Sequence, residues 1–565
     1  MQIIATPNFF KIHFKYTPYI VERVKELPER RFNSTEKVWM VPSKYRMEVE
    51  KFAIKYRFTW GEATNVPEQD YTIPALPELT LDIPLKMTLR EYQRGGVAYN
   101  LLHKKVIIGD DMGLGKTGQA IATIVGADIL SQQTGENSVF PCLVVCPSSV
   151  KYNWQNQFQM WTGRNMAMIM EDNIKKNYHL YYESGMAKVF IVNYESLKKY
   201  FVESIDVKHD VNGKKMPLRL DHIHFNQRIK MFNSIIIDEI HKVKDSKTQQ
   251  AKFAKGITHG KEWILGLTGT PVINKPKDLI SQLGIIDQMD KLGGYKKFTE
   301  RYCSGMNEAS NLKELNFMLN KHCFYRRSKQ EVAKELPPKT RQVVLCDITN
   351  PKEYKDAEND LINYLKQYKD ATDERIQRAM RGEVMVKIGI LKNISARGKI
   401  KDVTEFIDDI IEQGEKVVLF VHLKEVAANI KAHYPNSVTI TGDDSLIERQ
   451  QNIAKFKDNP KTNLIICSIK AAGTGVDGLQ HASSTVGFIE LPWHAADCDQ
   501  AEDRLNRIGQ TKSVQSFFFL GRNTIDTHIY DIIEAKRSIA DTITGNTDVV
   551  EVNIVDAIAN LFNQK

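Results

Sequence analysis

The fold class follows most directly from one stretch of the chain, Lys105-Val-Ile-Ile-Gly-Asp-Asp-Met-Gly-Leu-Gly-Lys-Thr117. Its apolar start predicts a buried strand, its glycines predict a tight turn, and residues 118–130 continue with helical spacing. A strand, a glycine-rich turn and a helix form the setting that a phosphate-binding loop requires. The stretch therefore predicts an α/β domain with a phosphate site where the helix begins.

The residues of this turn suit that chemistry. The glycines would let backbone N–H groups close around a phosphate, aided by the positive end of the following helix. The loop residues expected there are Met112, Gly113, Leu114 and Gly115. Lys116 would meet the phosphate oxygens, and the Thr117 hydroxyl would bind Mg²⁺. The strict pattern GxxxxGK[ST] is not met, because Asp110 stands at its first glycine. A coincidental loop is the alternative at this point.

A second stretch, Ser234-Ile-Ile-Ile-Asp-Glu-Ile-His241, is an apolar strand that ends in two adjacent carboxylates. An ATPase with a phosphate loop needs an acid at a strand end to hold Mg²⁺, and we expect Asp238 to be that acid. Glu239 then stands where it can orient and deprotonate the attacking water. Two solvated acids that cap a core strand are the alternative, which the phosphate loop upstream disfavours.

Short apolar runs separated by helical patterns continue along the chain. Runs that are buried on both faces and alternate with helices are typical of a parallel α/β sheet. The first set is Val106–Ile108, Leu143–Val145, Val189–Val192, Ile235–Ile237 and Ile264–Leu265, and the second is Val417–Val421, Val438–Ile440, Leu464–Ile466, Val486–Ile489 and Phe517–Leu520. Charged helical patterns dominate the residues between the two sets, where Val343–Leu345 is the one comparable run. We expect two similar α/β halves joined by a helical region.

Length and composition agree with a globular protein of several domains. The chain has 565 residues, of which 42% are hydrophobic and 26% charged, and this length is too great for one core. No apolar run approaches the roughly 20 residues that cross a bilayer, and the first residues lack the pattern of a secretory signal. Seven cysteines without a CxxC pair predict reduced thiols and no zinc site. These features predict a cytoplasmic protein without membrane contact.

The first 62 residues predict a small basic module. They hold 12 Lys/Arg against 7 Asp/Glu, in a chain whose net charge is +9. This balance favours a nucleic-acid partner, and a solvated Lys-rich surface is the alternative. Phe10 and Ile12 alternate with Lys11 and His13, which predicts a half-buried strand with a cationic outer face. The prolines that follow mark residues 63–86 as an extended linker.

Taken together, the motifs resemble those of SWI/SNF-like superfamily-two ATPases. Asp110–Thr117 and Asp238–His241 are similar to motifs I and II of that family. The other motifs follow in the family's order, at Leu89–Gln93, Cys146–Ser149 with Trp154, Leu267–Pro271, Tyr325–Lys329 with Leu336–Lys339, Ser468–Asp477 and Gln500–Gln510. Two positions depart from the family's pattern. Asn506 stands where many relatives have His, and His494 stands where Asn is common. Neither position carries the hydrolysis chemistry.

The resemblance implies two RecA-like parallel-sheet lobes with ATP and Mg²⁺ between them. It places Arg90 and Gln93 near the adenine, whose edge the glutamine reads, and it adds Gly475, Asp477 and Gln500 to the nucleotide site. Arg504 and Arg507 are three residues apart, which predicts one helix face. Such a pair is by itself more often a solvated face, but the complete motif favours arginine fingers that reach the γ-phosphoryl across the cleft.

The resemblance also implies that DNA lies across both lobes and is held through its phosphates. The motif positions expected there are Ser148, Thr268, Thr270, Lys470, Thr474 and Trp493, with core packing as the alternative for Trp493. Residues 10–58 resemble the HARP domain of annealing helicases, which implies recognition of branched or forked DNA. Its candidate contacts are Arg30, Arg31, Lys37 and Trp39. For Trp39 the alternative is the hydrophobic centre of so small a domain.

The expected organisation has six parts. They are a HARP-like α+β module at 1–62, a linker at 63–86, an ATP-binding lobe at 87–285, a helical inter-lobe region at 286–395, a second lobe at 396–535 and a tail at 536–565 that packs on the lobes.

The expected function is that of a monomeric DNA-dependent ATPase in a bacterium or a virus of bacteria. It would associate with the nucleoid, move on double-stranded or forked DNA, and anneal or remodel forks in replication, repair or recombination. A motor that acts on a protein–DNA complex in transcription recycling or DNA defence is one alternative. A non-catalytic DNA-binding scaffold is another, which the complete set of ATP-site residues disfavours.

Overall fold

The computed structural model of the chain describes residues 1–6, 9–33, 37–61, 71–171, 177–210, 213–214, 216–269, 276–303, 310–370, 374–469, 478–492 and 495–543. Side chains are described for all of these except 365–382, 446, 495–496 and 535–543. The chain forms two compact units, Met1–Thr72 and Ile73–Lys565. Each unit has its own sheets and core.

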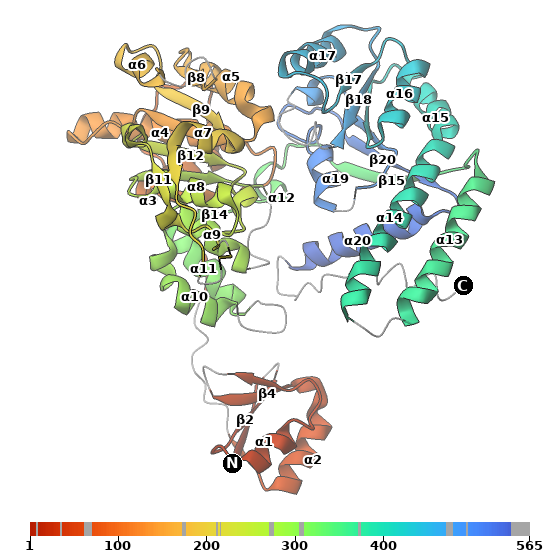
Figure 1. Cartoon of the computed structure of the whole chain (residues 1–565). Helices are drawn as coiled ribbons and strands as arrows, with labels where there is room; N and C mark the ends of the chain where they lie inside the picture. Colours follow the sequence, from red (N-terminus) through yellow and green to blue (C-terminus); the bar gives the residue numbers. More distant parts are fainter. Residues whose placement is uncertain are drawn as a thin grey trace. The chain divides into compact units, whose positions relative to one another are not determined.

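The first unit is a five-stranded mixed sheet in the order β3-β4-β2-β1-β5, accompanied by two helices (Figure 1). The strands are β1 (Gln2–Ala5), β2 (Phe9–His13), β3 (Arg31–Asn33), β4 (Val38–Pro42) and β5 (Thr59–Gly61), and the helices are α1 (Pro18–Val24) and α2 (Arg46–Tyr56). Phe10 and Ile12 are buried in the core of this unit, whereas Lys11 and His13 are partly exposed. The predicted period-two strand is confirmed.

The second unit contains two large sheets, and every strand pairing within them is parallel. The first sheet has the order β14-β6-β13-β12-β7-β9-β8. Its strands are β6 (Lys105–Ile108), β7 (Cys142–Cys146), β8 (Ala167–Ile169), β9 (Val189–Asn193), β12 (Ser234–Asp238), β13 (Trp263–Leu267) and β14 (Phe324–Tyr325). A separate antiparallel pair, β10 (Val202–Ile205) with β11 (Ile223–Phe225), accompanies it.

The second sheet has the order β15-β20-β19-β16-β18-β17. Its strands are β15 (Lys339–Cys346), β16 (Val417–Val421), β17 (Val438–Ile440), β18 (Leu464–Ser468), β19 (Thr485–Phe488) and β20 (Val514–Gly521). Most strands of both sheets are short runs rich in Val, Ile, Leu and Phe that are buried on both faces, as parallel sheets covered by helices require. The edge strand β15 differs, because most of its residues are exposed or partly exposed. The predicted fold class, two parallel-sheet α/β lobes with helical insertions and a small α+β module, is confirmed.

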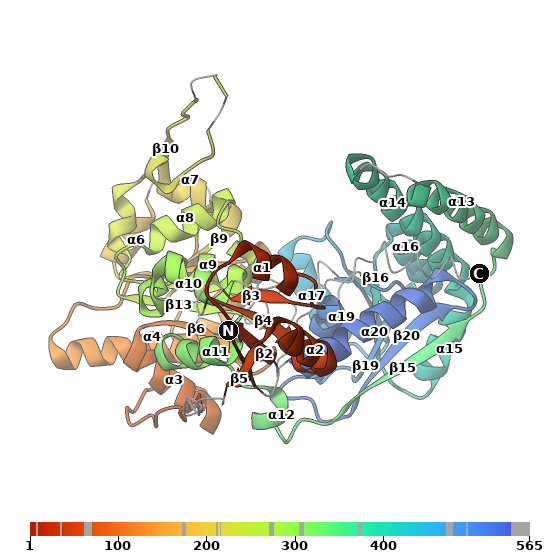
Figure 2. The ribbon, with the colours of Figure 1, turned by 90° about the horizontal axis from the view of Figure 1, so that it is seen from below.

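Helices cover both sheets (Figure 1). Those of the first lobe are α3 (Glu91–His103), α4 (Lys116–Thr134), α5 (Lys151–Thr162), α6 (Tyr178–Glu183), α7 (Leu197–Phe201), α8 (Gln249–Thr258), α9 (Pro276–Ile285), α10 (Gly294–Tyr302) and α11 (Leu312–His322), followed by the short α12 (Lys329–Val332). Those of the second lobe are α13 (Pro351–Asp370), α14 (Glu374–Gly398), α15 (Ile400–Glu412), α16 (Lys424–His433), α17 (Leu446–Asp458), α19 (Ala495–Glu502) and α20 (Ile525–Ile543). The long helices α13 and α14 lie side by side in both views (Figure 2).

Two segments differ in character from what their composition indicates. The region 286–395 is largely helical, yet it also supplies β14 to the first sheet and β15 to the second. Residues 73–86 form no helix or strand and belong to the second unit, where Leu79 is buried in the core of the first lobe. A proline-rich composition predicts an extended backbone at these residues. It does not reveal that alternate apolar side chains pack against the core of the first lobe.

Candidate active site

The glycine-rich turn joins β6 to α4 and has the backbone that the sequence predicts. Gly113 and Gly115 have φ angles of 84° and 73°, in the left-handed region that favours glycine. A Cβ atom on Gly115 would lie 2.5 Å from Gln93 Nε2, and one on Gly113 would lie 2.9 Å from Arg507 Cβ. The turn is therefore a cradle with room for backbone only, and α4 begins directly after it at Lys116.

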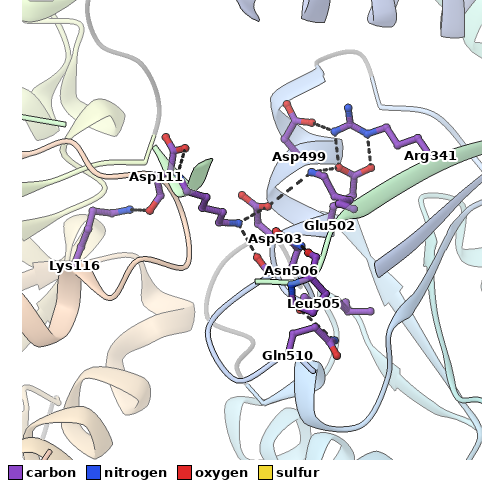
Figure 3. Close-up of polar contacts among 12 residues, drawn as sticks. Asp111, Lys116, Arg341, Asp499, Glu502, Asp503, Leu505, Asn506 and Gln510 are labelled. Carbon is purple, nitrogen blue, oxygen red and sulfur yellow. Dashed lines mark hydrogen bonds and ion pairs between the residues drawn. The ribbon is translucent and has the colours of Figure 1, made fainter. Parts of the chain in front are cut away.

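The Lys116 side chain folds back over this turn (Figure 3). Its Nζ donates to the backbone oxygens of Asp110 at 2.7 Å and Asp111 at 3.2 Å. Burial lowers the pKa of the Lys116 ammonium, and the carboxylates of Glu239, Asp110 and Asp238 act against that shift. The ammonium donates to backbone oxygens and not to a carboxylate, so a phosphate oxygen can take their place.

Asp110, where the strict pattern has glycine, is an anchor for the turn. Its side chain is fully buried and accepts hydrogen bonds from the backbone N–H of Arg327 at 3.0 Å and from Arg327 Nε at 2.9 Å. Gln119 Nε2 donates to its other oxygen at 2.9 Å. A buried carboxylate that is paired and fully hydrogen-bonded is a stable arrangement. The departure from the pattern therefore fixes the loop to the segment after β14.

The two acids of the second motif lie at the end of β12. Asp238 Oδ2 accepts a hydrogen bond from the Trp154 indole at 2.8 Å, and its backbone oxygen accepts one from the Tyr194 hydroxyl at 2.6 Å. Burial and the neighbouring Glu239 charge raise the pKa of Asp238 to about 6, while the Trp154 bond acts in the opposite direction. Two buried aromatic residues thus orient the acid that we expect to hold Mg²⁺.

Glu239 has a left-handed backbone, with φ 54° and ψ 50°. Such a conformation costs a side-chain-bearing residue roughly 1–3 kcal/mol and is typical of functional sites. Burial opposes ionisation of Glu239, yet His241, Lys116 and Arg504 together hold its pKa below the ordinary value. Its buried Oε2 has no hydrogen-bond donor among the described residues. His241 Nδ1 lies 3.2 Å from this oxygen, but not in the direction of a hydrogen bond. The surroundings of Glu239 therefore favour its ionised form, and its role as the base stays a prediction.

His241 joins the second motif to the third. Its Nδ1 lies 3.1 Å from the hydroxyl of Thr268, which is fully buried just after β13. The sequence predicts a DNA contact at Thr268, but its side chain lies inside the ATP-side network in this structure. Ser148 is exposed at the start of a short 3-10 helix after β7, where a contact with a ligand is sterically open.

The region before α3 closes the other side of the turn. Gln93 is buried, its side-chain oxygen accepts from the Arg90 backbone N–H at 2.9 Å, and its Nε2 donates to Leu114 O at 3.1 Å. The Arg90 side chain pairs with Glu335. Gln93 therefore touches the phosphate loop directly, and its reading of an adenine edge stays a prediction.

The arginine motif follows α19. Gln500 lies on α19, but this helix ends at Glu502, so the prediction that Arg504 and Arg507 share a helix face is wrong. Both arginines make backbone hydrogen bonds that span fewer residues than those of an α-helix, Arg504 N–H to Ala501 O and Arg507 N–H to Leu505 O. The chain then turns at Gly509, whose φ is 98°. Both arginines nevertheless reach the site, Arg507 beside Gly113 and Arg504 near enough to Glu239 to lower its pKa.

Several predicted contacts cannot be placed. Thr270, Lys470, Thr474, Gly475, Asp477 and Trp493 lie outside the described residues. In the first unit Arg30 and Lys37 are exposed and Arg31 is partly exposed. Trp39 is partly buried against the core of that unit, and its ring lies 5.3 Å from that of Phe32. The tryptophan therefore packs against the core and still presents part of its ring to solvent.

Sequence reasoning assigned no role to four residues that complete the site. They are Trp154, Tyr194, His241 and Arg327. Trp154, His241 and Arg327 lie inside or beside motifs of the chain. Their positions indicate that they matter, but their residue types do not reveal what each one contacts. Tyr194 follows β9, and only the three-dimensional arrangement brings it to Asp238.

The fold and the site define the class of the protein. Two parallel α/β sheets, a glycine-rich phosphate cradle, a strand-end acid pair and arginines from the second lobe are the parts of a helicase-type ATPase. Residues 92–396 match the family described as the SNF2-related domain, and residues 398–509 match the helicase conserved C-terminal domain. The chain therefore belongs to the SNF2-related family, and the predicted enzyme class, a DNA-dependent ATPase, is confirmed.

Individual proteins show the same similarity. The chain is 28% identical over 567 residues to the SWI/SNF-related matrix-associated actin-dependent regulator of chromatin subfamily A-like protein 1 of Xenopus tropicalis, covering 94% of this chain and 54% of the relative. It is 27% identical over 507 residues to the DNA annealing helicase and endonuclease ZRANB3 of Homo sapiens, covering 86% of this chain and 42% of the relative. The chain thus spans about half the length of these relatives.

Among solved structures, the Sulfolobus solfataricus SWI2/SNF2 ATPase core in complex with dsDNA is 24% identical and has a TM-score of 0.39. The match covers 84% of this chain and 96% of that one. Within the described part of the present chain, no helix combines the length and the apolar character needed to cross a bilayer.

Proposed function

We propose that this chain couples hydrolysis of ATP·Mg²⁺ to movement along double-stranded or forked DNA. The observation that carries the proposal is the meeting of two sets of residues from different lobes. Lys116 and Glu239 come from the first lobe, and Arg504 and Arg507 come from the second. A site assembled from two lobes can transmit nucleotide turnover into lobe movement.

The residues fit ATP and Mg²⁺. The cradle at Gly113 and Gly115 has no room for side chains but offers backbone N–H groups, and Lys116 supplies positive charge. Thr117 and Asp238 offer the hard oxygen donors that Mg²⁺ prefers, and the ion would neutralise charge on the transferring phosphoryl group. These residues would bind and orient the nucleotide.

The chain's own residues then supply the proton chemistry and the charge. Glu239 would accept the proton of the attacking water, since it is ionised and its Oε2 can accept a hydrogen bond. Arg504 and Arg507 would stabilise the charge that develops on the γ-phosphoryl. His241, between Glu239 and Thr268, would carry the state of the site to the third motif.

We infer annealing or fork remodelling as the outcome of this movement. One similar protein is named a DNA annealing helicase, and the first unit has a basic sequence with exposed Arg30 and Lys37. Charges of this kind bind nucleic-acid phosphates without reading sequence, and the exposed part of Trp39 could stack on an unpaired base. The HARP-like role of this unit, and a place in replication or repair, belong to the same proposal.

ATP turnover with single-stranded, duplex and forked DNA tests the proposal, together with Lys116→Ala and Glu239→Gln. We expect stimulation by duplex or forked DNA that both substitutions abolish. Turnover that is unchanged in both variants would refute the assigned site, and turnover indifferent to DNA would refute the motor.

A further inference from the structure

A series of basic residues connects the two lobes, and each contacts an acid of a motif at one side of the site. These residues lie in the connecting segment, residues 326–341, which follows β14 of the first sheet and includes the first three residues of β15 of the second. They are Arg326, Arg327, Lys329, Lys339 and Arg341. Their partners are the two acids of the phosphate loop and three acids of the α19 region.

The residues at the N-terminal end of the connecting segment contact the phosphate loop. Arg327 is paired with buried Asp110, as described above. The next acid, Asp111, accepts from Arg326 Nη2 at 3.1 Å and from the backbone N–H of Lys329 at 3.1 Å. The loop is thus bound to the segment by charge as well as by backbone contacts.

The other end holds α19. Glu502 is fully buried, and Arg341 donates to both of its carboxylate oxygens at 2.8 Å and 2.6 Å. Lys339 Nζ lies 2.6 Å from the same carboxylate, and Arg341 also donates to Asp499 at 2.6 Å. These contacts fix the end of the helix after which the arginine motif begins.

Lys329 alone among these basic residues contacts both sides through described atoms. Its backbone N–H donates to the Asp111 carboxylate, while its Nζ donates to Asp503 Oδ1 at 2.7 Å and to the backbone oxygen of Asn506 at 2.7 Å. Its side chain is 15% exposed. A Cβ on Gly113 would lie 3.4 Å from Lys329 Cε and 2.9 Å from Arg507 Cβ. The lysine, the phosphate turn and the arginine turn are therefore in direct packing contact.

We propose that Lys329 is a positioning residue that sets Arg504 and Arg507 against the phosphate loop. Asp503 directly precedes Arg504, and Asn506 directly precedes Arg507, so the ammonium contacts the residue before each arginine, through the Asp503 side chain and the Asn506 backbone oxygen. This inference rests on the proposed function, because it assigns Lys329 to the same ATP site. An arginine held about 1 Å from its productive position can cost a rate of order a hundredfold.

The test compares Lys329→Met with Lys334→Met in the full chain. Lys334 is exposed in the same segment, so its substitution makes the same change of charge away from the site. We measure DNA-stimulated kcat, and we measure binding of ADP alone and of ADP with aluminium fluoride, which mimics the transferring phosphoryl group. Lys329→Met should lower kcat about a hundredfold and reduce the preference for ADP with aluminium fluoride by a similar factor, with ADP affinity unchanged. Lys334→Met should match the wild type in all three.

The inference is overturned if Lys329→Met matches Lys334→Met, or if ADP affinity and kcat fall together, as a merely structural contact predicts. Asp503→Asn is the second variant, should Lys329→Met not fold, and it should show the same selective loss. In the double variant the two losses should be far from additive, because both remove one contact. A wild-type chain without DNA-stimulated turnover would instead refute the proposed function, so the two failures are distinguishable.

Discussion

The contacts of a single residue, Asp110, explain why the phosphate loop departs from the strict motif. A strict phosphate loop has glycine at this position, and the sequence alone leaves open whether the substitution disables the loop. The buried ion pair with Arg327 shows that the aspartate fastens the loop to the connecting segment. The site is complete without the first glycine because the backbone freedom it needs comes from Gly113 and Gly115.

Replacing Asp110 with Asn should therefore destabilise the chain. The substitution leaves the Arg327 guanidinium buried without its counter-charge, and breaking such a pair costs about 3–5 kcal/mol of the free energy of unfolding. Urea unfolding followed by circular dichroism measures this change. Asp531→Asn, at an exposed position, is the control. Equal stability of the Asp110 and Asp531 variants would contradict the anchoring role.

Glu239→Gln should separate nucleotide binding from hydrolysis. Glutamine keeps the size of the side chain but cannot accept the proton of water, and loss of a general base lowers kcat roughly 10²–10⁴-fold. Equilibrium binding of a fluorescent ATP analogue should be unchanged, whereas Lys116→Ala should weaken it. A Glu239→Gln enzyme that retains wild-type kcat would show that another group activates the water.

At the scale of elements, Glu502 binds α19 to β15. Burial alone would raise the pKa of this carboxyl, but Arg341 and Lys339 lower it to about 2. A folded-state pKa below the unfolded value of roughly 4.3 stabilises the fold above that pH. The stabilisation should be lost as the pH falls from about 5 towards 2.

Unfolding of the wild type and of Glu502→Gln across this pH range tests the pairing. The wild type should lose stability on acidification, by an amount on the order of 3 kcal/mol attributable to this carboxyl. The glutamine variant should be less stable at pH 7 and should show a correspondingly flatter profile. Parallel profiles of the two proteins would mean that Glu502 does not titrate as its contacts imply.

The elements also show which parts of the structure the sequence could predict. Apolar runs such as Ile235–Ile237 and Val417–Val421 identify buried parallel strands, because a run that is apolar at every position is buried on both faces and its short length and β-branched residues favour a strand over a helix. The prediction that Arg504 and Arg507 share a helix face is wrong, because a spacing of three residues is equally compatible with a turn. The role of Tyr194 and the strand β14 were also beyond prediction, since both depend on contacts between distant segments.

The first unit carries a prediction of its own. Arg30→Glu with Lys37→Glu changes two exposed side chains and leaves the buried core of this unit intact. If the unit recognises branched DNA through phosphates, the double variant should lose most of its preference for forked over linear duplex while keeping turnover on linear duplex. Titration of ATPase rate against each DNA at several salt concentrations measures this preference. A preserved fork preference would place recognition elsewhere in the chain.

At the scale of the whole molecule, the proposed chemistry is divided between the two lobes of the second unit, with the expected base Glu239 in the first and the expected arginine fingers in the second. Motifs in the sequence predicted both halves, since each motif carries its own residue types. The connection between them is visible only in the structure, where the segment 326–341 pairs with acids of both lobes. Under the proposed function, nucleotide turnover would move the lobes through the contacts that Lys329 and Arg507 make at the phosphate loop.

The central claim is that ATP hydrolysis drives the chain along duplex DNA. Displacement of a third strand from a DNA triplex measures such movement directly, with duplex of increasing length placed before the triplex. The account predicts ATP-dependent displacement with a lag that grows with duplex length, and no displacement by Glu239→Gln. Robust ATP turnover without displacement, or displacement without a length-dependent lag, would contradict the claim.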